Sequence, residues 1–228
     1  MENVPQLLDH DVFQQFLTSL NGYATWWSVV ECASFGIPQT RKRLVLLASR
    51  LKGGELGLQQ MAGDSVTVRQ AIGSLPRLGA GDRDPRDVLH AAPSLSPLNA
   101  RRIKASRPGG TWRDWPLELQ ADCHRKLSGA TYPSVYGRME WDQPAPTITT
   151  QCFGYGNGRF GHPEQDRAIS LREAAILQTF PPDYQFADVA SDVKFSRMGR
   201  LIGNAVPVRL GEVIGKAFVA HVAQTGSR

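Results

Sequence analysis

The chain has 228 residues, 41% of them hydrophobic, and a formal net charge of +5. This length and apolar content suit a globular protein of one large domain or one and a half smaller ones, and no segment is long enough to span a membrane or to act as a signal peptide. The basic excess favours a polyanionic partner, and three cysteines without a Cys-x-x-Cys pair or a histidine cluster predict reduced thiols, a cytoplasmic protein and no structural metal.

The first fifty residues predict a helix followed by two paired strands. Apolar side chains recur at intervals of three and four over residues 8–20, and Asp9 or Asp11 can cap the start of this helix. Residues 25–30 are rich in β-branched and aromatic side chains, which favours a strand. The unbroken apolar run at 44–48 is typical of a buried strand, and we expect it to pair with the first one.

Three polar side chains precede the second strand at a spacing of two. Gln39, Arg41 and Arg43 share one face of an extended backbone. Two guanidinium groups and a carboxamide then form an array of donors for phosphate oxygens or for the edge of a base. The plainer alternative, which these residues alone favour, is a strand that begins with a solvated basic segment.

Residues 52–165 predict an irregular insert with short strands and a small core of its own, because glycine and proline recur there and periodicity is weak. Five basic and no acidic side chains lie between 99 and 113. Arg107 and Arg113 alternate with two tryptophans around a Pro-Gly-Gly turn, which suits neutralisation of a nucleic-acid backbone together with stacking. The alternative is that one or both tryptophans belong to the core of the insert.

A short strand is predicted at 147–150, and a glycine-rich loop follows it. The glycines at 156–161 fit the G-x-G-x-x-G pattern of dinucleotide-binding folds, which would favour an oxidoreductase. That pattern must open a helix, and Pro163 with the polar residues behind it argues against one. The loop, with Arg159, is better explained as backbone that approaches a large ligand closely.

Two helices are predicted near the C-terminal end. Ser170 and Glu173 form a capping box for a helix through Leu177. A second helix begins near Pro207, a residue favoured in the first turn. The segment 203–205 before it can either approach a polar ligand closely or simply cap the helix, and the residues leave both alternatives open.

In this order, the segments resemble the C-terminal part of a cytosine-5 DNA methyltransferase. The matching blocks are Glu-Asn-Val at 2–4, Gly-x-Pro-Gln-x-Arg-x-Arg at 36–43, a Pro-x-x-Thr block at 144–150, RAISLREAAILQTFP at 167–181 and Gly-Asn-Ala-Val-Pro at 203–207. Each block alone is a weak signal, but five in register over nearly the whole chain are specific.

The resemblance implies an α/β fold in which an incomplete doubly wound, Rossmann-like methyltransferase sheet carries a small, irregular, mostly-β recognition domain. It divides the chain into three parts. These are the first part of the C-terminal half of the catalytic domain (1–51), a target-recognition domain (52–165) and a return to the catalytic domain with the C-terminal helices (166–228).

The resemblance also implies roles for individual residues. In the family a cytosine is flipped out of the duplex, and a cysteine thiolate adds to C6 before C5 takes a methyl group from S-adenosyl-L-methionine. Glu2, by default a solvated carboxylate, matches the acid that donates to N3. Arg43 matches the arginine that holds O2, and Arg41 matches one near the target nucleotide and its phosphates. Asn204 and Ala205 match positions that contact the cofactor.

The implied partner is double-stranded DNA, which the recognition region is expected to read in the major groove. The candidates for contacts with DNA are Gln39, Arg101, Arg107, Arg113, Arg138 and Arg159.

Two parts that the family would require are missing from the sequence. No segment resembles the Phe-x-Gly-x-Gly loop that cradles the methionine part of the cofactor, and no cysteine follows a proline, as the nucleophile does in the family. The paired strands are therefore expected to present an unpaired edge. We predict that a complementing N-terminal methyltransferase chain supplies the missing half and that the isolated chain is inactive. The start at Met1, directly before the Glu-Asn-Val block, favours a separate reading frame over a truncated fragment. The alternative function is a non-catalytic DNA-binding module.

Overall fold

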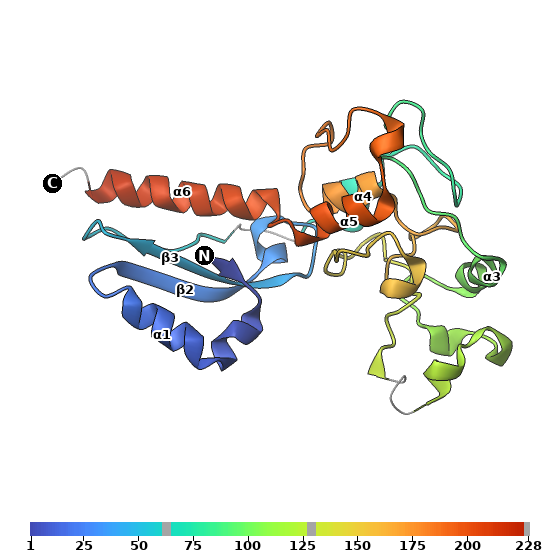
Figure 1. Ribbon diagram of the computed structural model, residues 1–228, viewed down its shortest axis with the longest axis horizontal. Helices are drawn as coiled ribbons and strands as arrows, with labels where there is room; N and C mark the ends of the chain where they lie inside the picture. The colour runs from blue at the N-terminus through green and yellow to red at the C-terminus, as the bar shows by residue number, and fades with distance from the viewer. Residues whose placement is uncertain (61–64, 127–130, 226–228) are drawn as a thin grey trace.

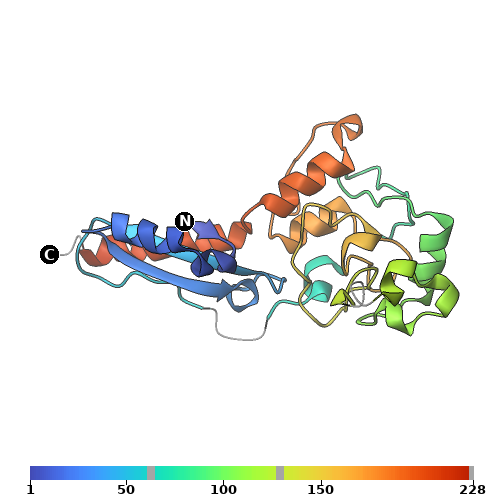
Figure 2. The same ribbon diagram turned by 60° about the horizontal axis from the view of Figure 1, so that its bottom comes forward.

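The computed structural model describes residues 1–60, 65–126 and 131–225, which form two lobes (Figures 1 and 2). The first lobe is a sheet between two helices, and its elements are β1 (Glu2–Asn3), α1 (Asp11–Ser19), β2 (Ala24–Glu31), β3 (Lys42–Ser49) and α6 (Val208–Thr225). The second lobe is largely irregular, and its helices are α2 (Val68–Ile72), α3 (Pro97–Ala105), α4 (Leu171–Leu177) and α5 (Phe195–Asn204). None of the described helices is long and apolar enough to cross a membrane.

The sheet confirms the predicted pair of strands. β2 and β3 are antiparallel along their full length, and β1 pairs with the other side of β3, which gives the order β1-β3-β2. β1 covers only Leu44 and Val45, and the Met1 ammonium group donates to the carbonyl of Leu46 at 2.8 Å. Beyond that point, through Ser49, this side of β3 has no strand beside it among the described residues. This is the unpaired edge that the sequence predicts.

β3 is buried on both faces because its side chains alternate between two apolar clusters. Leu44 and Leu46 pack with Phe13 of α1, whereas Val45 and Leu47 pack on the side of α6. Figure 1 shows the two helices on opposite faces of the sheet. A strand that is covered on both faces has a continuous apolar sequence, which explains the run at 44–48.

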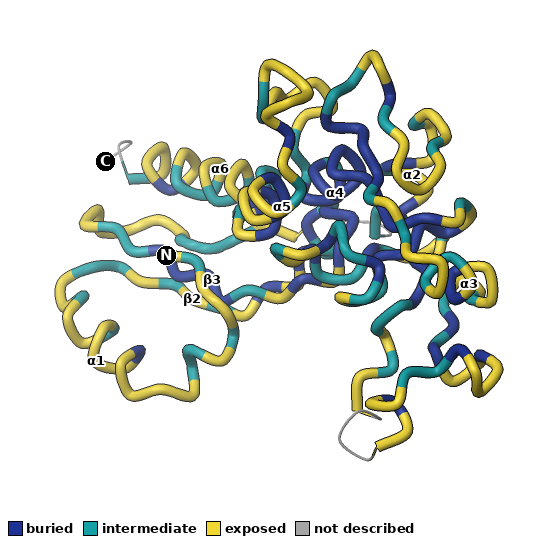
Figure 3. The backbone as a smooth tube through the Cα atoms, turned by 45° about the vertical axis from the view of Figure 1, so that its right-hand side comes forward, coloured by how far each residue is buried: buried dark blue, intermediate teal, exposed yellow. Residues whose placement is uncertain are grey.

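The first helix is shorter than predicted. Pro5–Asp9 forms a 3-10 helix of its own, and α1 begins at Asp11 without a side-chain cap. The capping role predicted for Asp9 or Asp11 is therefore wrong, because the first residue ends the 3-10 turn and the second lies inside the helix. The outer side of α1 is exposed (Figure 3) and carries Val12 and Phe16.

The prediction of a mostly-β insert is wrong for the described residues, which contain isolated bridges in place of strands. The segment predicted as a strand at 147–150 shows the physical reason. The N–H of Ile148 donates to Gln39 Oε1 at 2.9 Å, and the carbonyl of Ile148 accepts from Arg41 Nη1 at 2.9 Å. Side chains thus satisfy the backbone groups that a neighbouring strand would otherwise satisfy.

One apolar core joins the insert to the segment that follows it. Its buried residues include Ile72 and Leu89 from the insert, Leu177 from α4, and Met198 and Ile202 from α5. α4 and α5 therefore pack on the insert, and α6 returns to the sheet.

A buried ion pair lies at the start of α4. The two terminal nitrogens of Arg167 donate to the two carboxylate oxygens of Glu173 at 2.8 and 2.7 Å, and both side chains are at most 1% exposed. Glu173 also accepts from the N–H of Ser170, whose hydroxyl accepts from the N–H of Glu173, so the predicted capping box is confirmed. His162 lies 3.8 Å from Glu173, and its Nδ1 accepts from two backbone N–H groups.

We expect the free energy of unfolding to decrease between pH 6.5 and pH 4 because of His162. Burial lowers the pKa of His162 from 6.5 to about 4, although the charge of Glu173 opposes the shift. The stabilising contribution is complete above pH 6.5 and is lost as the pH falls to about 4, since the unfolded chain takes up this proton first. A shift of this size corresponds to about 3 kcal/mol. Urea unfolding across this range measures the loss.

The matched variant for this test is His162→Asn. Its amide oxygen can replace Nδ1 as the acceptor but does not titrate in this range. The dependence of stability on pH should become flatter in the variant. An equally steep dependence of stability on pH would mean that groups other than His162 cause it.

Candidate functional site

A pocket of about 420 Å³ lies between the two lobes. Its walls come from β1, β3, the segment 147–150 and the end of α5, which are far apart in the sequence. It is lined by Glu2, Asn3, Val4, Arg41, Arg43, Thr147, Ile148, Thr149, Thr150, Gly203 and Asn204. The structure therefore brings together Glu2, Arg41, Arg43 and Asn204 from the predicted set of site residues.

The register of β1 on β3 places Glu2 beside Arg43. Glu2 is opposite Val45, so Arg43, two residues away on the same face of β3, is its diagonal neighbour. Arg43 Nε lies 2.7 Å from Glu2 Oε1, and the two side chains are 14% and 20% exposed. The contact is an ion pair, but its angles are not those of a hydrogen bond. Glu2 Oε1 therefore has no hydrogen-bond partner in the described part of the chain.

Arg41 joins the two lobes. It is 4% exposed, and its terminal nitrogens donate to the carbonyl of Ile148 at 2.9 Å and to that of Gly203 at 3.3 and 3.4 Å. Burial lowers the pKa of Arg41, and the positive charge of Arg43 lowers it further. Its Nε is buried and has no hydrogen-bond partner among the residues described.

Gln39 is fully buried and also joins the lobes. Its carboxamide donates to the carbonyl of Leu177 and to Gln178 Oε1, each at 3.0 Å, and accepts from the N–H of Ile148. The sequence predicted that Gln39 and Arg41 donate to phosphate or to the edge of a base. In the structure, Gln39 and the terminal nitrogens of Arg41 donate to the second lobe instead. This corrects the DNA-contacting role predicted for Gln39, because its side chain has no exposed surface and its donor group is occupied.

Gly203 and Asn204 end α5, whereas the sequence places them at the entrance of the last helix. Asn204 is exposed and lines the pocket. Ala205 does not line it, and its carbonyl accepts from Gln178 Nε2 at 3.3 Å. Gly203 permits a close approach between α5 and the pocket wall, since a Cβ there would lie 2.3 Å from the carbonyl carbon of Thr149. Gly203 thus closely approaches the protein's own backbone, and the close approach of this segment to a polar ligand stays a prediction.

Most of the predicted DNA-contacting arginines of the insert lie at its surface. Arg101, Arg107 and Arg113 are exposed, and Arg159 is partly buried. Arg107 lies 3.2 Å from a carboxylate oxygen, and the guanidinium carbon of Arg113 lies 5.3 Å from the centre of the Trp112 ring. Arg159 donates to a backbone carbonyl at 2.7 Å. None of the four lines the pocket between the lobes.

Arg138, in contrast, is 4% exposed. Each nitrogen of its guanidinium group already has a partner, and these partners are the carbonyls of Ile103, Ser106, His162 and Gln165 and the carboxylate of Asp166. This arrangement corrects the DNA-contacting role predicted for Arg138, because a guanidinium group with no free donor holds the insert together instead.

The two tryptophans of the insert belong to its small core. Trp112 and Trp115 are 5% and 4% exposed and pack with Leu119. The indole N–H of Trp112 donates to the carbonyl of Tyr132 at 3.1 Å, and that of Trp115 donates to the hydroxyl of Ser106 at 2.9 Å. The core alternative for the tryptophans is therefore confirmed.

None of the three thiols lines the pocket. Cys32 and Cys152 are 0% exposed, and burial raises the pKa of the first to about 11 and that of the second to about 12. Cys123 is exposed but lies outside the pocket lining. Thiols with such high pKa values supply little thiolate at neutral pH, so Cys32 and Cys152 cannot serve as nucleophiles.

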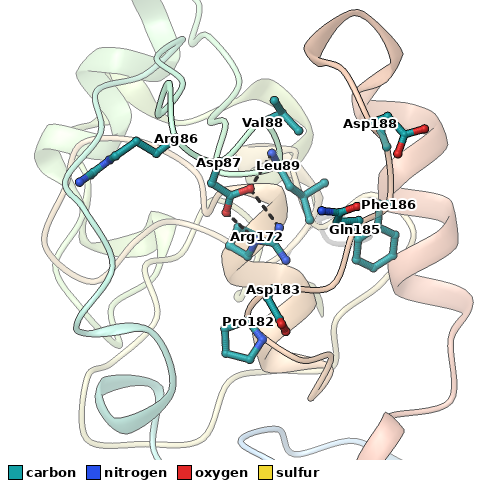
Figure 4. A pocket seen from close by; sticks show the side chains of 11 residues that line it. Arg86, Asp87, Val88, Leu89, Arg172, Pro182, Asp183, Gln185, Phe186 and Asp188 are labelled. Atoms are coloured by element: carbon teal, nitrogen blue, oxygen red, sulfur yellow. Dashed lines mark hydrogen bonds and ion pairs between the residues drawn. The ribbon is translucent and has the colours of Figure 1, made fainter.

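A second pocket, of about 410 Å³, shares no lining residue with the first (Figure 4). At its centre, Arg172 donates to Asp87 at 2.6 and 3.0 Å. With Arg86, Asp183 and Asp188, its lining has two positive and three negative side chains. This balance does not suit an anionic ligand such as DNA. No group of side chains suited to holding a metal ion occurs among the described residues.

The sequence interpretation missed four polar residues of the pocket between the lobes. These are Asn3, Thr147, Thr149 and Thr150. All four lie inside blocks that match the family, so the block match is the signal that could have identified them.

A family model described as C-5 cytosine-specific DNA methylase matches residues 1–220. The type II methylase M.HgiDII of Herpetosiphon aurantiacus is 56% identical over 96% of this chain and 63% of its own length. The type II methyltransferase M1.BsuMI of Bacillus subtilis is 34% identical over 94% of this chain and 49% of its own length. The structure of Spodoptera frugiperda DNMT2 aligns with a TM-score of 0.58 and 16% identity, over 96% of this chain and 65% of that chain.

These comparisons confirm the resemblance seen in the sequence and the α/β class of the fold. The chain spans between about half and two thirds of the length of the three proteins. With four of the five matched blocks lining one pocket, the conclusion is that the chain belongs to the C-5 cytosine-specific DNA methylase family.

Proposed function

We propose that this chain is the C-terminal part of a DNA cytosine-5 methyltransferase, and that it flips and holds the target cytosine, recognises the DNA and contributes to the cofactor site. Members of the family take the methyl group from S-adenosyl-L-methionine. The observation that carries the proposal is the convergence of Glu2, Arg41 and Arg43 on one pocket between the lobes.

The pocket suits the edge of a cytosine. Arg41 Nε is buried without a hydrogen-bond partner among the described residues, which costs about 1–3 kcal/mol. Glu2 Oε1 has an ion-pair contact with Arg43 but likewise no hydrogen-bond partner there. A base that enters the pocket, with a small adjustment of the two side chains, offers them partners of the right kind. N3 of cytosine accepts a hydrogen bond from a protonated Glu2, and O2 accepts from Arg43 or Arg41.

The cofactor fits this chain only at the edge of the pocket. The sulfonium group of S-adenosyl-L-methionine is a cation, and the charges of Arg41 and Arg43 would repel it from the pocket itself. Asn204, which is exposed and lines the pocket, can contact the cofactor with a neutral carboxamide. When bound, the cofactor supplies an electrophilic methyl group. Most of its binding site must therefore be provided by residues outside this chain.

A complementing segment is required for two further reasons. The nucleophilic thiolate has to come from elsewhere, because the buried thiols Cys32 and Cys152 have raised pKa values and Cys123 does not line the pocket. The side of β3 beyond Leu46 offers unpaired backbone groups that a further strand can satisfy. We propose that an N-terminal methyltransferase segment or chain binds along this edge.

The isolated chain is expected to transfer no methyl groups to DNA. Duplex DNA is incubated with radiolabelled S-adenosyl-L-methionine and either this chain alone or this chain with the N-terminal part of M.HgiDII, the relative at 56% identity. Label should enter cytosine only when both parts are present. Label incorporated by this chain alone would contradict the missing-nucleophile argument.

The same experiment separates the alternative of a non-catalytic DNA-binding module. If no N-terminal partner, including one encoded beside this chain, restores methylation while the chain still binds duplex DNA, the binding module is supported instead.

A further inference from the structure

α5 has a buried face and an exposed face. Met198 and Ile202 are buried, and Gly199 and Gly203 approach the backbone of the pocket wall so closely that a Cβ on either would collide with it. The exposed face comprises the helix cap Lys194 and the residues Ser196, Arg197, Arg200, Leu201 and Asn204. Because the buried face is fixed against the second lobe, the exposed face has a defined direction relative to the pocket.

The exposed face is basic and lacks internal counter-charges. Lys194, Arg197 and Arg200 are its charged residues, and no acidic residue lies on the helix. Their side chains make no hydrogen bond or ion pair with another residue in the described part of the chain. Two of them lie at the N-terminal end, where the helix dipole disfavours positive charge. These side chains therefore do not serve the stability of the helix, and an anionic ligand explains them better.

The basic face leads directly to the pocket. Asn204, which lines the pocket, lies seven residues after Arg197, and this spacing puts both residues on the same side of the helix. Arg200 lies one turn from Asn204. The distance along the axis from Arg197 to Asn204 is about 10 Å at 1.5 Å per residue. The phosphates of one strand recur about every 3.4 Å along the duplex axis, so α5 would span about three of them if it lay parallel to that axis.

We propose that the exposed face of α5 binds the phosphates of the DNA strand that carries the extruded cytosine, on one side of that nucleotide. The inference rests on the proposed function and extends it. The pocket holds the base, while Arg197 and Arg200 hold the neighbouring phosphates. Their contribution is independent of the base sequence, since phosphate contacts position a duplex without reading it.

The first test compares salt dependence. Binding of the chain to a fluorescent duplex is measured by anisotropy at several salt concentrations, for the wild type and for the double variant Arg197→Gln/Arg200→Gln. Loss of two phosphate contacts should make the slope of log K against log salt shallower by about 1.8. The matched control is Arg50→Gln/Lys216→Gln, which removes the same charge from two exposed positions outside α5. Its slope should stay close to that of the wild type.

The second test locates the contact. The duplex carries a mismatched cytosine and three uncharged methylphosphonate linkages on either the 5′ or the 3′ side of it. For the wild type, neutral linkages on one side should weaken binding. For the double variant, the same linkages should cause little further loss, because the contacts are already absent.

The outcomes separate this inference from the proposed function. Equal salt slopes for the wild type and the α5 variant, or losses that add independently on both sides of the cytosine, would overturn the assignment of α5 and leave the pocket unaffected. A wild-type chain that binds no duplex DNA at all, alone or with its N-terminal complement, would overturn both.

Discussion

Glu2→Gln is expected to reduce methylation by the reconstituted enzyme by about 10²–10⁴-fold, the usual contribution of a general acid. The amide has almost the same shape as the carboxyl group, but it cannot carry the proton that makes the cytosine ring accept a nucleophile. It also loses the ion pair with Arg43, which lies 2.7 Å away. Methyl transfer from labelled cofactor to duplex DNA, measured in single turnover, gives the rate of the chemical step.

The control for this prediction is Asp9→Asn, which removes an exposed carboxylate that does not line the pocket. Its rate should equal that of the wild type. DNA affinity should be unchanged in both variants. A Glu2→Gln enzyme that methylates at the wild-type rate would show that Glu2 is not the acid, and a parallel loss of DNA affinity would assign it to binding instead.

Arg167→Met is expected to destabilise the folded chain by about 3–5 kcal/mol, because it leaves the buried carboxylate of Glu173 without its partner. The carboxylate of Glu173, which is 1% exposed, loses two hydrogen-bond donors at once. Glu173 also closes the capping box of α4, so the start of that helix is expected to loosen. Urea unfolding followed by circular dichroism measures the loss.

Two companion variants make this prediction specific. The double variant Arg167→Met/Glu173→Leu should recover part of the lost stability, since it removes the unpaired charge as well. Arg69→Met breaks an ion pair with Asp142 whose side chains are 55% and 77% exposed, and it should change the stability little. An equal loss of stability in Arg167→Met and Arg69→Met would show that the buried ion pair contributes no more to stability than the exposed one.

Local signals in the sequence predicted those elements that local chemistry determines. The apolar run of β3 and the Ser170–Glu173 capping box follow from burial and from hydrogen bonds between near neighbours, and both were predicted. The segment 147–150 was predicted as a strand but is satisfied by the side chains of Gln39 and Arg41, which lie more than 100 residues away. No property of the segment itself reveals such partners.

The sequence likewise predicted only part of the candidate site. The family blocks brought Glu2, Arg41, Arg43 and Asn204 to notice, and the structure places these residues around one pocket. Neither the composition nor the spacing indicated that Arg138 would be buried with all its donors occupied. An arginine in a basic segment looks the same in sequence whether it faces solvent or main-chain carbonyls.

The hydrogen bonds between the two lobes have a consequence for engineering. Arg41 binds the carbonyls of Ile148 and Gly203, and Gln39 Nε2 binds that of Leu177 at 3.0 Å. Main-chain carbonyls are present whatever the side chains are, so these contacts depend on the path of the backbone and not on its composition. The second lobe of a relative could therefore replace that of this chain, provided that the glutamine and arginine side chains are retained and the backbone of 147–150 keeps its course.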